Sequence, residues 1–238
     1  MAVKAKSYGF IGKPAPAPRG NAVGRVVGLL REAIASMEMK PGEVIDKLAL
    51  CERLGLSRFP VSEALARLRE EGLVDIEPQR GTFVSRLRLA DVRQNLFIRR
   101  ALEAEAVSAL ARRLPASMGE ALSRNLRQQR AAVAAEDRSG FHALDVEFHE
   151  LLLSALDFPR VKAVVESARL GLDRVRRLLA TPRRNSVTLA EHARILAALQ
   201  KADATAAADA MRAHIDAVSR ELDLLAKHNP QLFADLES

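Results

Sequence analysis

The chain has 238 residues, 48% of them hydrophobic and 28% charged, with a net charge of +7 and a pI near 10.1. This balance excludes an intrinsically disordered chain, and a single cysteine, Cys51, excludes an intramolecular disulfide and a cysteine-rich zinc site. No apolar run approaches the roughly 18 residues needed to span a bilayer, and no apolar segment follows the basic N-terminus, so we expect a cytoplasmic protein without a membrane partner.

The first third of the chain predicts a basic tail, then short helices and a hairpin. Residues 1–20 hold four basic residues, no acidic residue and a Pro-Ala repeat, which is typical of a flexible tail. Beyond the tail, Asp46 is placed to cap a second helix, and Gly55 and Ser57 mark the turn into a third. The predicted elements are helices near 23–37, 46–54 and 57–71 and strands near 73–77 and 82–85.

This order of elements is that of a winged helix-turn-helix, in which the third helix reads DNA. An Arg at its N-terminal end fits a guanine edge with two parallel hydrogen bonds, and a glycine at the wing tip lets the backbone approach a groove. The candidate DNA-binding residues are Ser57, Arg58, Phe59, Ser62, Arg67, Arg80 and Gly81. The alternative is a small helical subdomain with ordinary surface arginines that serves in protein contacts.

Two segments of this region carry a resemblance to a known family. Residues 54–73 read Leu-Gly-Leu-Ser-Arg-Phe-Pro-Val-Ser-Glu-Ala-Leu-Ala-Arg-Leu-Arg-Glu-Glu-Gly-Leu, and residues 79–84 read Gln-Arg-Gly-Thr-Phe-Val. These segments resemble the DNA-binding domain of GntR-family bacterial regulators, and the resemblance covers residues 21–85. Phe59 stands where the family usually has Thr, and Ser62 where it usually has Arg, so the operator is expected to differ from the family's common one.

The rest of the chain is predicted to be almost continuously helical. The expected fold class is therefore mainly α, with an N-terminal winged helix-turn-helix followed by a C-terminal antiparallel all-α bundle of about six helices. Breaks between these helices are expected near Pro115, Ser139-Gly140, Phe158-Pro159, Thr181-Pro182 and 201–204. The predicted domains are a flexible basic tail at 1–20, the winged helix at 21–85, a linker at 86–91, the helical domain at 92–228 and a C-terminal tail at 229–238.

Four ionisable side chains fall on the apolar stripes of three predicted helices. Asp145 and His149 are four residues apart, so they share the core face of the helix near 141–156. His192 and His214 occupy the same kind of position on the last two long helices. A lone core histidine is usually just hydrogen-bonded, and an Asp–His pair can be a buried salt link. An Asp and three His that converge in a bundle also suit a divalent metal.

A second resemblance bears on these residues. Segments 144–149, 191–195 and 211–214 are similar to the metal motifs of the FCD effector domain, found in the FadR branch of the GntR family. This resemblance covers roughly residues 90–226, and it implies a divalent metal, zinc in the first place, with nickel and manganese as alternatives. The implied ligands are Asp145, His149, His192 and His214. Arg99 resembles the residue that faces the effector in such pockets.

Several other polar residues match no functional position. His142 and His228 are expected at the surface. Arg174, Arg176 and Arg177 are expected on a solvated face, although one of them could line the pocket.

Two classes of function follow from these patterns. The first is a transcriptional regulator that binds double-stranded, pseudo-palindromic operator DNA as a homodimer, and whose operator affinity is controlled by a small carboxylate metabolite at the metal site. We expect that effector to release the DNA. The alternative is a metal-dependent hydrolase or lyase that uses the Asp/His cluster. It leaves the winged helix unexplained, and no separate general base is identifiable, so no catalytic residue is assigned.

Overall fold

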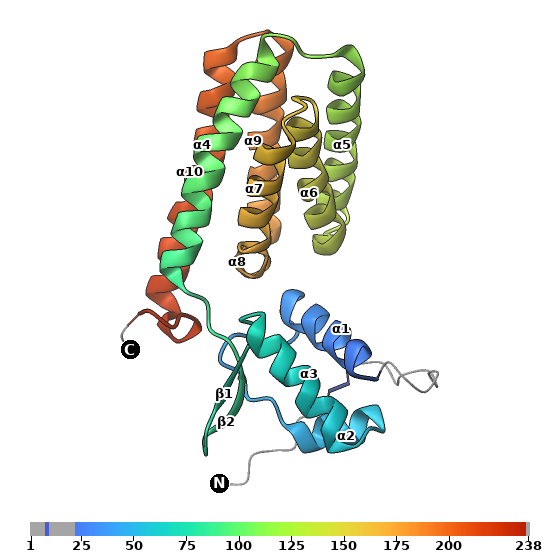
Figure 1. Cartoon of the computed structure of the whole chain (residues 1–238). Coiled ribbons are helices and arrows are strands. Elements are labelled where there is room, and N and C mark those ends of the chain that lie inside the picture. The colour runs from blue at the N-terminus through green and yellow to red at the C-terminus, as the bar shows by residue number, and fades with distance from the viewer. Residues whose placement is uncertain (1–7, 10–21, 237–238) are drawn as a thin grey trace. The chain divides into compact units, whose positions relative to one another are not determined.

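The computed structural model describes residues 8–9 and 22–236 and divides the chain into two compact units (Figure 1). Of the described residues, the first unit holds those up to Arg88 together with 229–236, and the second unit is Leu89–His228. The chain therefore leaves the first unit at Arg88 and returns to it after the helical unit.

The first unit is a winged helix-turn-helix, as the sequence predicts. Its elements are α1 (Ala22–Ala35), α2 (Lys47–Leu54), α3 (Arg58–Glu70), β1 (Val74–Glu77) and β2 (Gly81–Val84). The two strands pair antiparallel, with Val74 opposite Val84. Because Val26, Leu30 and Ile34 recur at helical spacing, α1 has one apolar face, and α1 packs on α3 in the core of the unit.

The turns of this unit follow from local sequence signals. The Asp46 side chain accepts hydrogen bonds from the backbone N–H groups of Leu48 and Ala49, which caps α2. Gly55 ends α2 in the left-handed conformation, with a φ of 62°. Gly81 at the wing has a φ of 124°, which L side chains rarely adopt, so the hairpin turn favours glycine at this position.

Tyr8 departs from the flexible tail predicted for residues 1–20, most of which lie outside the described residues. Its side chain is only 1% exposed and belongs to the core of the first unit. Its hydroxyl oxygen accepts a hydrogen bond of 2.8 Å from the backbone N–H of Asp46. A buried aromatic ring with a satisfied hydroxyl anchors this point of the chain to the start of α2.

The C-terminal segment also belongs to the first unit. Leu87 and Phe233 form a parallel bridge, next to a hydrogen bond of 2.9 Å from the Leu87 N–H to the carbonyl of Leu232. Phe233 is 1% exposed and follows the short 3-10 helix η1 (Pro230–Leu232). The described part of this segment, 229–236, is therefore packed against the winged-helix unit.

The second unit is an all-helical bundle, and the mainly α fold class is confirmed. Its helices are α4 (Leu89–Ala111), α5 (Ala116–Ala134), α6 (Arg138–Ser154), α7 (Pro159–Leu170), α8 (Asp173–Leu179), α9 (Pro182–Gln200) and α10 (Ala204–His228). One break that the sequence analysis does not predict separates the short α8 from α7 at Gly171. A Cβ atom at Gly171 would collide with the side chain of Asn95 on α4, so glycine permits this close approach.

Packing within the bundle brings four inward helix faces together. Helices α4 and α10 lie side by side, and α10 also packs on α9 (Figure 1). Helix α5 packs on α6 and α9, and α4 touches both α6 and α9. The inward faces of α4, α6, α9 and α10 therefore share one interior. Across the described residues, none of the helices combines the length and apolarity that a membrane crossing needs.

Candidate functional site

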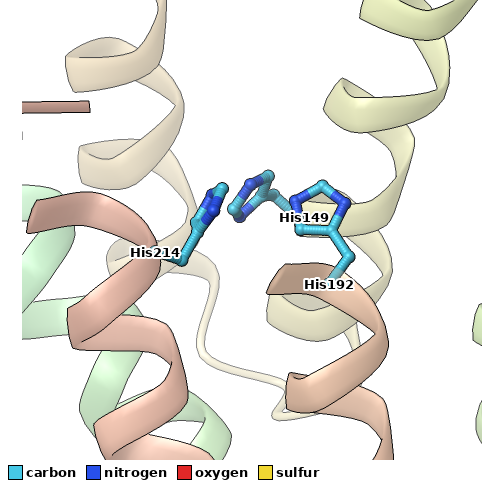
Figure 2. Close-up of side chains that lie close together, drawn as sticks. All are labelled: His149, His192 and His214. Atoms are coloured by element: carbon cyan, nitrogen blue, oxygen red, sulfur yellow. The ribbon is translucent and has the colours of Figure 1, made fainter. Parts of the chain in front are cut away.

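Three histidines meet in the interior of the helical unit. His149 lies on α6, His192 on α9 and His214 on α10, and each is at most 3% exposed. Their rings point toward one another (Figure 2), and one ring nitrogen of each lies within 4.8 Å of the others. Each histidine stands on the apolar stripe of its helix, so the packing of the bundle itself brings the three rings together.

Each imidazole is held from behind by a hydrogen-bond acceptor. The Nδ1 contacts are His149 with Glu103 Oε2 at 2.5 Å, His192 with Gln129 Oε1 at 3.0 Å and His214 with Glu191 Oε2 at 2.8 Å. The amide nitrogen of Gln129 donates to Asn125 at 2.7 Å, which leaves its oxygen for His192. Because all three partners accept, each Nδ1 carries the proton and each Nε2 keeps a lone pair for a ligand.

Burial keeps the three imidazoles neutral. It lowers the pKa of His149 to about 3 and the pKa of His192 well below its ordinary value. Burial also lowers the pKa of His214, against an opposing hydrogen bond. Burial alone would raise the pKa of Glu103, but the charge of Arg99 and the hydrogen bonds from His149 and Arg99 outweigh it and hold that pKa well below its ordinary value. Neutral imidazole is the form that binds a metal.

Asp145, the fourth predicted ligand, lies beside one histidine of the three. Its Oδ1 atom is 3.6 Å from His192 Nε2, and its Oδ2 atom forms an ion pair with Arg176. The Nε2 atom of His192 is buried and has no hydrogen-bond partner among the described residues. Such an unsatisfied buried nitrogen is costly, and three neutral imidazoles beside a carboxylate are donors that divalent metals accept. The triad could therefore bind a metal ion, and the side chains present fit one.

Arg99, the predicted effector residue, reaches the same site. It is 1% exposed, and its Nε atom lies 2.6 Å from Glu103 Oε1. Its Nη2 atom lies 3.4 Å from the Nε2 atom of His149. Glu103 thus bridges Arg99 and His149. One edge of the guanidinium is committed to this carboxylate, and the other edge faces the triad.

A small cavity opens beside the triad and carries an excess of positive charge. Its volume is about 50 Å³, room for a few water molecules, so a bound metabolite must move side chains at its wall. The charged and ligand-type residues that line it include Arg99, Arg138, Asp145, Arg176, Arg184 and His214. Four arginines face a single lining carboxylate, which favours an anionic occupant.

The cavity is also lined by His142, which the sequence analysis expects at the surface, and by Arg176, for which it expects a solvated face but leaves a place in the pocket open. The side chain of His142 is 14% exposed, and that of Arg176 is 11% exposed. Burial, together with the charge of Arg176, lowers the pKa of His142 to about 4, and burial lowers the pKa of Arg176 to about 9. The reason is the short α8, which lays Asp173 and Arg176 against the N-terminal half of α6. His228 is exposed, as expected.

The residues predicted to contact DNA are all exposed on the first unit. They are Ser57, Arg58, Phe59, Ser62, Arg67, Arg80 and Gly81. Phe59 is 76% exposed in the first turn of α3, beside Arg58. Ser57 is the N-cap of α3, but its hydroxyl makes no capping hydrogen bond and is open to a partner. Exposure of these groups along one helix and at one wing is what groove contact requires.

Both units match known protein families. The model of bacterial regulatory proteins of the gntR family matches residues 22–84, and the FCD domain model matches residues 95–217. RspR, an HTH-type transcriptional repressor of Escherichia coli (strain K12), is 32% identical over 215 residues, which cover 89% of this chain and 93% of RspR. The chain belongs to the GntR family and carries an FCD domain.

Other relatives agree with this assignment. An HTH-type transcriptional regulator from an unstable DNA locus of Streptomyces ambofaciens is 36% identical over 207 residues, which cover 86% of each chain. The solved structure of E. coli McbR/YncC shares the fold, with a TM-score of 0.64 at 20% identity over 85% of this chain and 97% of that one. These GntR-family homologues are transcriptional regulators, not enzymes, so the hydrolase or lyase alternative is set aside.

The sequence analysis of this GntR-family chain missed the acceptors behind the three rings. Glu103 and Gln129 are 2% and 0% exposed. Gln129 follows Leu122 and Leu126 on the inward stripe of α5, as the histidines do on theirs. A polar residue on an apolar stripe was therefore an available signal at Gln129. Glu191 carried no such signal, because it directly precedes His192 and therefore lies about 100° away from it around the helix, off the stripe that His192 occupies.

Proposed function

We propose that this GntR-family regulator binds a pseudo-palindromic operator as a homodimer, and that a small carboxylate bound at a divalent metal in the FCD domain controls its operator affinity. The main support for metal and carboxylate binding is the three buried histidine rings. Each ring carries its proton on Nδ1, so its Nε2 atom keeps a lone pair for a ligand. Apolar side chains at these three positions would fill the core without the desolvation cost, so the cluster points to a ligand.

Different residues are proposed to bind the metal and to orient its ligands. His149, His192, His214 and Asp145 would hold the metal, with zinc as the first choice and nickel and manganese as alternatives. The bound metal would supply coordination positions for carboxylate oxygens. The acceptors behind the rings fix their orientation, an effect worth about 10- to 100-fold in metal affinity in other proteins.

The cations around the triad favour a carboxylate as the effector. Arg99 lies against the ring of His149, and a guanidinium pairs with a carboxylate through two parallel hydrogen bonds. A carboxylate at the metal could therefore accept hydrogen bonds from Arg99 at the same time. The surrounding arginines add a long-range attraction for the anion.

On the DNA side, the proposed contacts are sorted by chemistry. Arg58 would read a guanine edge, and the exposed ring of Phe59 would contact an apolar group such as a thymine methyl. The Ser57 hydroxyl, which makes no capping hydrogen bond, and the N-terminus of α3 suit a backbone phosphate. The remaining proposed contacts are Ser62 and Arg67 on α3 and Arg80 and Gly81 at the wing.

Dimerisation and the direction of control complete the proposal. One winged helix buries a small surface, whereas two linked half-sites multiply the affinity. We assign DNA binding to 21–85 and ligand binding and dimerisation to 92–228, joined by the linker 86–91. The relative RspR is named a repressor, which supports release of the operator by the effector. Sedimentation at micromolar concentration should show a dimer, and a monomer would contradict this part.

The experiment that tests the proposal couples metal, carboxylate and DNA in one assay. An operator is first selected from random duplex DNA with the purified protein. Small carboxylates are then titrated into the labelled protein–operator complex, once with zinc-loaded protein and once after chelation. We expect release of DNA only from the zinc-loaded protein. Equal release of DNA from the zinc-loaded and the chelated protein would show that the metal is not needed for the response.

A further inference from the structure

The cavity beside the triad extends along two helices. Thr188 and Asn185 line it from α9, four and seven residues before His192, and so share one face of that helix. On α6, Arg138 lies seven residues before Asp145, and both line the cavity. With a rise of 1.5 Å per residue, the row from His192 to Asn185 spans about 10 Å. The cavity therefore runs from the triad toward the N-terminal ends of α6 and α9.

Arg176 on α8 lines this cavity and is only partly satisfied. Its Nη2 atom forms an ion pair with Oδ2 of Asp145, whose Oδ1 faces His192. Its Nη1 atom is buried and donates to no acceptor in the part of the chain that the structure describes. The carboxylate of Asp173 is 3.8 Å from Nη1, beyond hydrogen-bond distance. A buried N–H group without an acceptor is costly, so Nη1 offers a ready donor to a ligand.

The charge balance of the cavity singles out the same residue. Two of its arginines have buried carboxylates of their own, Arg99 with Glu103 and Arg184 with Glu191. Arg176 pairs with Asp145, the carboxylate that the metal site would also use, and its second carboxylate neighbour is the partly exposed Asp173 at 3.8 Å. Asp145 is the single carboxylate that lines the cavity, so a cavity that holds a divalent cation and Arg176 is short of negative charge.

We propose that the effector is a short dicarboxylate, with one carboxylate at the metal centre and Arg99 and the second at Arg176. The inference rests on the proposed function, because the first carboxylate uses the metal site described there. The second carboxylate would accept from the unsatisfied Nη1 of Arg176. Thr188 and Asn185 provide polar groups along the wall between the two ends. Arg138 is exposed, so its side chain can move to admit the ligand.

A positioning role for Arg176 is the rival interpretation. In that case Arg176 would act only through Asp145, by holding this carboxylate toward His192. The two roles differ in how they depend on the ligand. A positioning residue affects every carboxylate equally, whereas a binding residue affects only ligands that carry the second carboxylate.

Calorimetric titration of zinc-loaded protein separates the two roles. The ligands are succinate, its monomethyl ester and butyrate, in which a methyl group replaces one carboxylate of succinate. The proteins are wild type, Arg176→Gln and the control Arg130→Gln, which removes one exposed charge on α5 outside the cavity. We expect wild type to bind succinate about 10- to 100-fold more tightly than butyrate or the monoester. Arg176→Gln should lose this preference with butyrate affinity unchanged, and Arg130→Gln should keep it.

Several outcomes would overturn the inference. These are equal loss of succinate and butyrate binding in Arg176→Gln, no preference for succinate in wild type, or no binding of either ligand. Bound zinc is measured in each preparation, and the monoester comparison in wild type stands even if the variant loses zinc. Operator release is scored separately. If succinate binds through Arg176 without changing operator affinity, the proposed control of DNA binding fails, and only the assignment of the second carboxylate to Arg176 stands. If succinate and butyrate release the operator equally, the proposed function is supported and the inference of a dicarboxylate effector fails.

Discussion

The Nδ1 atom of His214 lies 2.8 Å from Oε2 of Glu191, the residue directly before His192. One turn of α9 therefore supplies one ring of the triad and orients another. Arg184 holds the same carboxylate with hydrogen bonds of 3.0 and 3.2 Å. Burial would raise the pKa of Glu191, but His214 and Arg184 outweigh it and lower that pKa. The ring of His214 is thus oriented by the ionised carboxylate of Glu191, which Arg184 holds in place.

This relationship predicts the effect of Glu191→Ala. With its acceptor gone, His214 loses its fixed orientation, and zinc affinity should fall about 10- to 100-fold without loss of the fold. Competition with a chromogenic chelator measures the change. Glu105→Ala, an exposed position on α4, is the matched control and should leave zinc affinity unaltered. Unchanged affinity in Glu191→Ala would show that the Nδ1 acceptors do not serve a metal site.

Removal of a triad member should have a larger effect than removal of its support. His192→Ala or His214→Ala is expected to abolish stoichiometric metal and to remove the zinc-dependent part of the melting temperature, because binding to the folded state alone stabilises it. His142 lines the same cavity but is not a proposed ligand, so His142→Ala should retain the metal. Elemental analysis of protein purified without chelator, paired with thermal unfolding, decides the point. A site that zinc, nickel and manganese all fail to fill would contradict it.

Acid should destabilise the metal-free protein. Burial lowers the pKa of His149 to about 3 and also lowers the pKa values of His192 and His214. In the unfolded chain a histidine has a pKa of about 6.5. Below that pH the unfolded chain binds protons that the folded protein does not. The free energy of unfolding should therefore fall as pH decreases from about 6.5, by up to about 1.4 kcal/mol per pH unit for each histidine.

Denaturant unfolding of chelated protein at pH 7, 6 and 5 measures this slope. His149→Gln removes one titrating group and should give a shallower decline. A stability that does not change between pH 7 and pH 5 would mean that the rings are not held neutral by burial.

Arg58→Ala tests the DNA-reading end of α3. If Arg58 reads a guanine edge, its loss should cost about 1–3 kcal/mol of specific operator binding and relax discrimination at one base pair. Arg212 is a partly exposed charge on α10, and Arg212→Ala controls for the change in net charge. Fluorescence anisotropy on the selected operator and on single-base variants gives both quantities. Unchanged discrimination would mean that another residue occupies the reading position.

Much of the architecture could be predicted because local signals and tertiary packing agree. Asp46 and Gly55 mark the ends of α2 through a cap and a left-handed residue. The inward position of His192 and His214 follows from the 3.6-residue period of long helices, which also places their neighbours in the core. Periodicity therefore identified the triad as residues that share an interior.

What could not be predicted depends on contacts between elements with weak periodicity of their own. The short α8 is seven residues long, too short to show a stripe, and so Arg176 read as a solvated arginine although it pairs with Asp145. Tyr8 and Phe233 lie in segments with no regular pattern, yet each is 1% exposed. They are buried because they pack against the winged-helix unit, and local sequence patterns do not predict such a contact.

Control of operator affinity by a carboxylate at the triad is the core of the proposed function. The most direct measurement titrates succinate into the zinc-loaded protein–operator complex for wild type, Arg99→Ala and His149→Ala. We predict that saturating succinate weakens operator binding by wild type about 5- to 150-fold, the range of a typical coupling of 1–3 kcal/mol. Both variants should bind the operator normally without succinate and respond to it far less. An equal shift in all three proteins would contradict the account, because the controlling ligand would then bind away from His149 and Arg99.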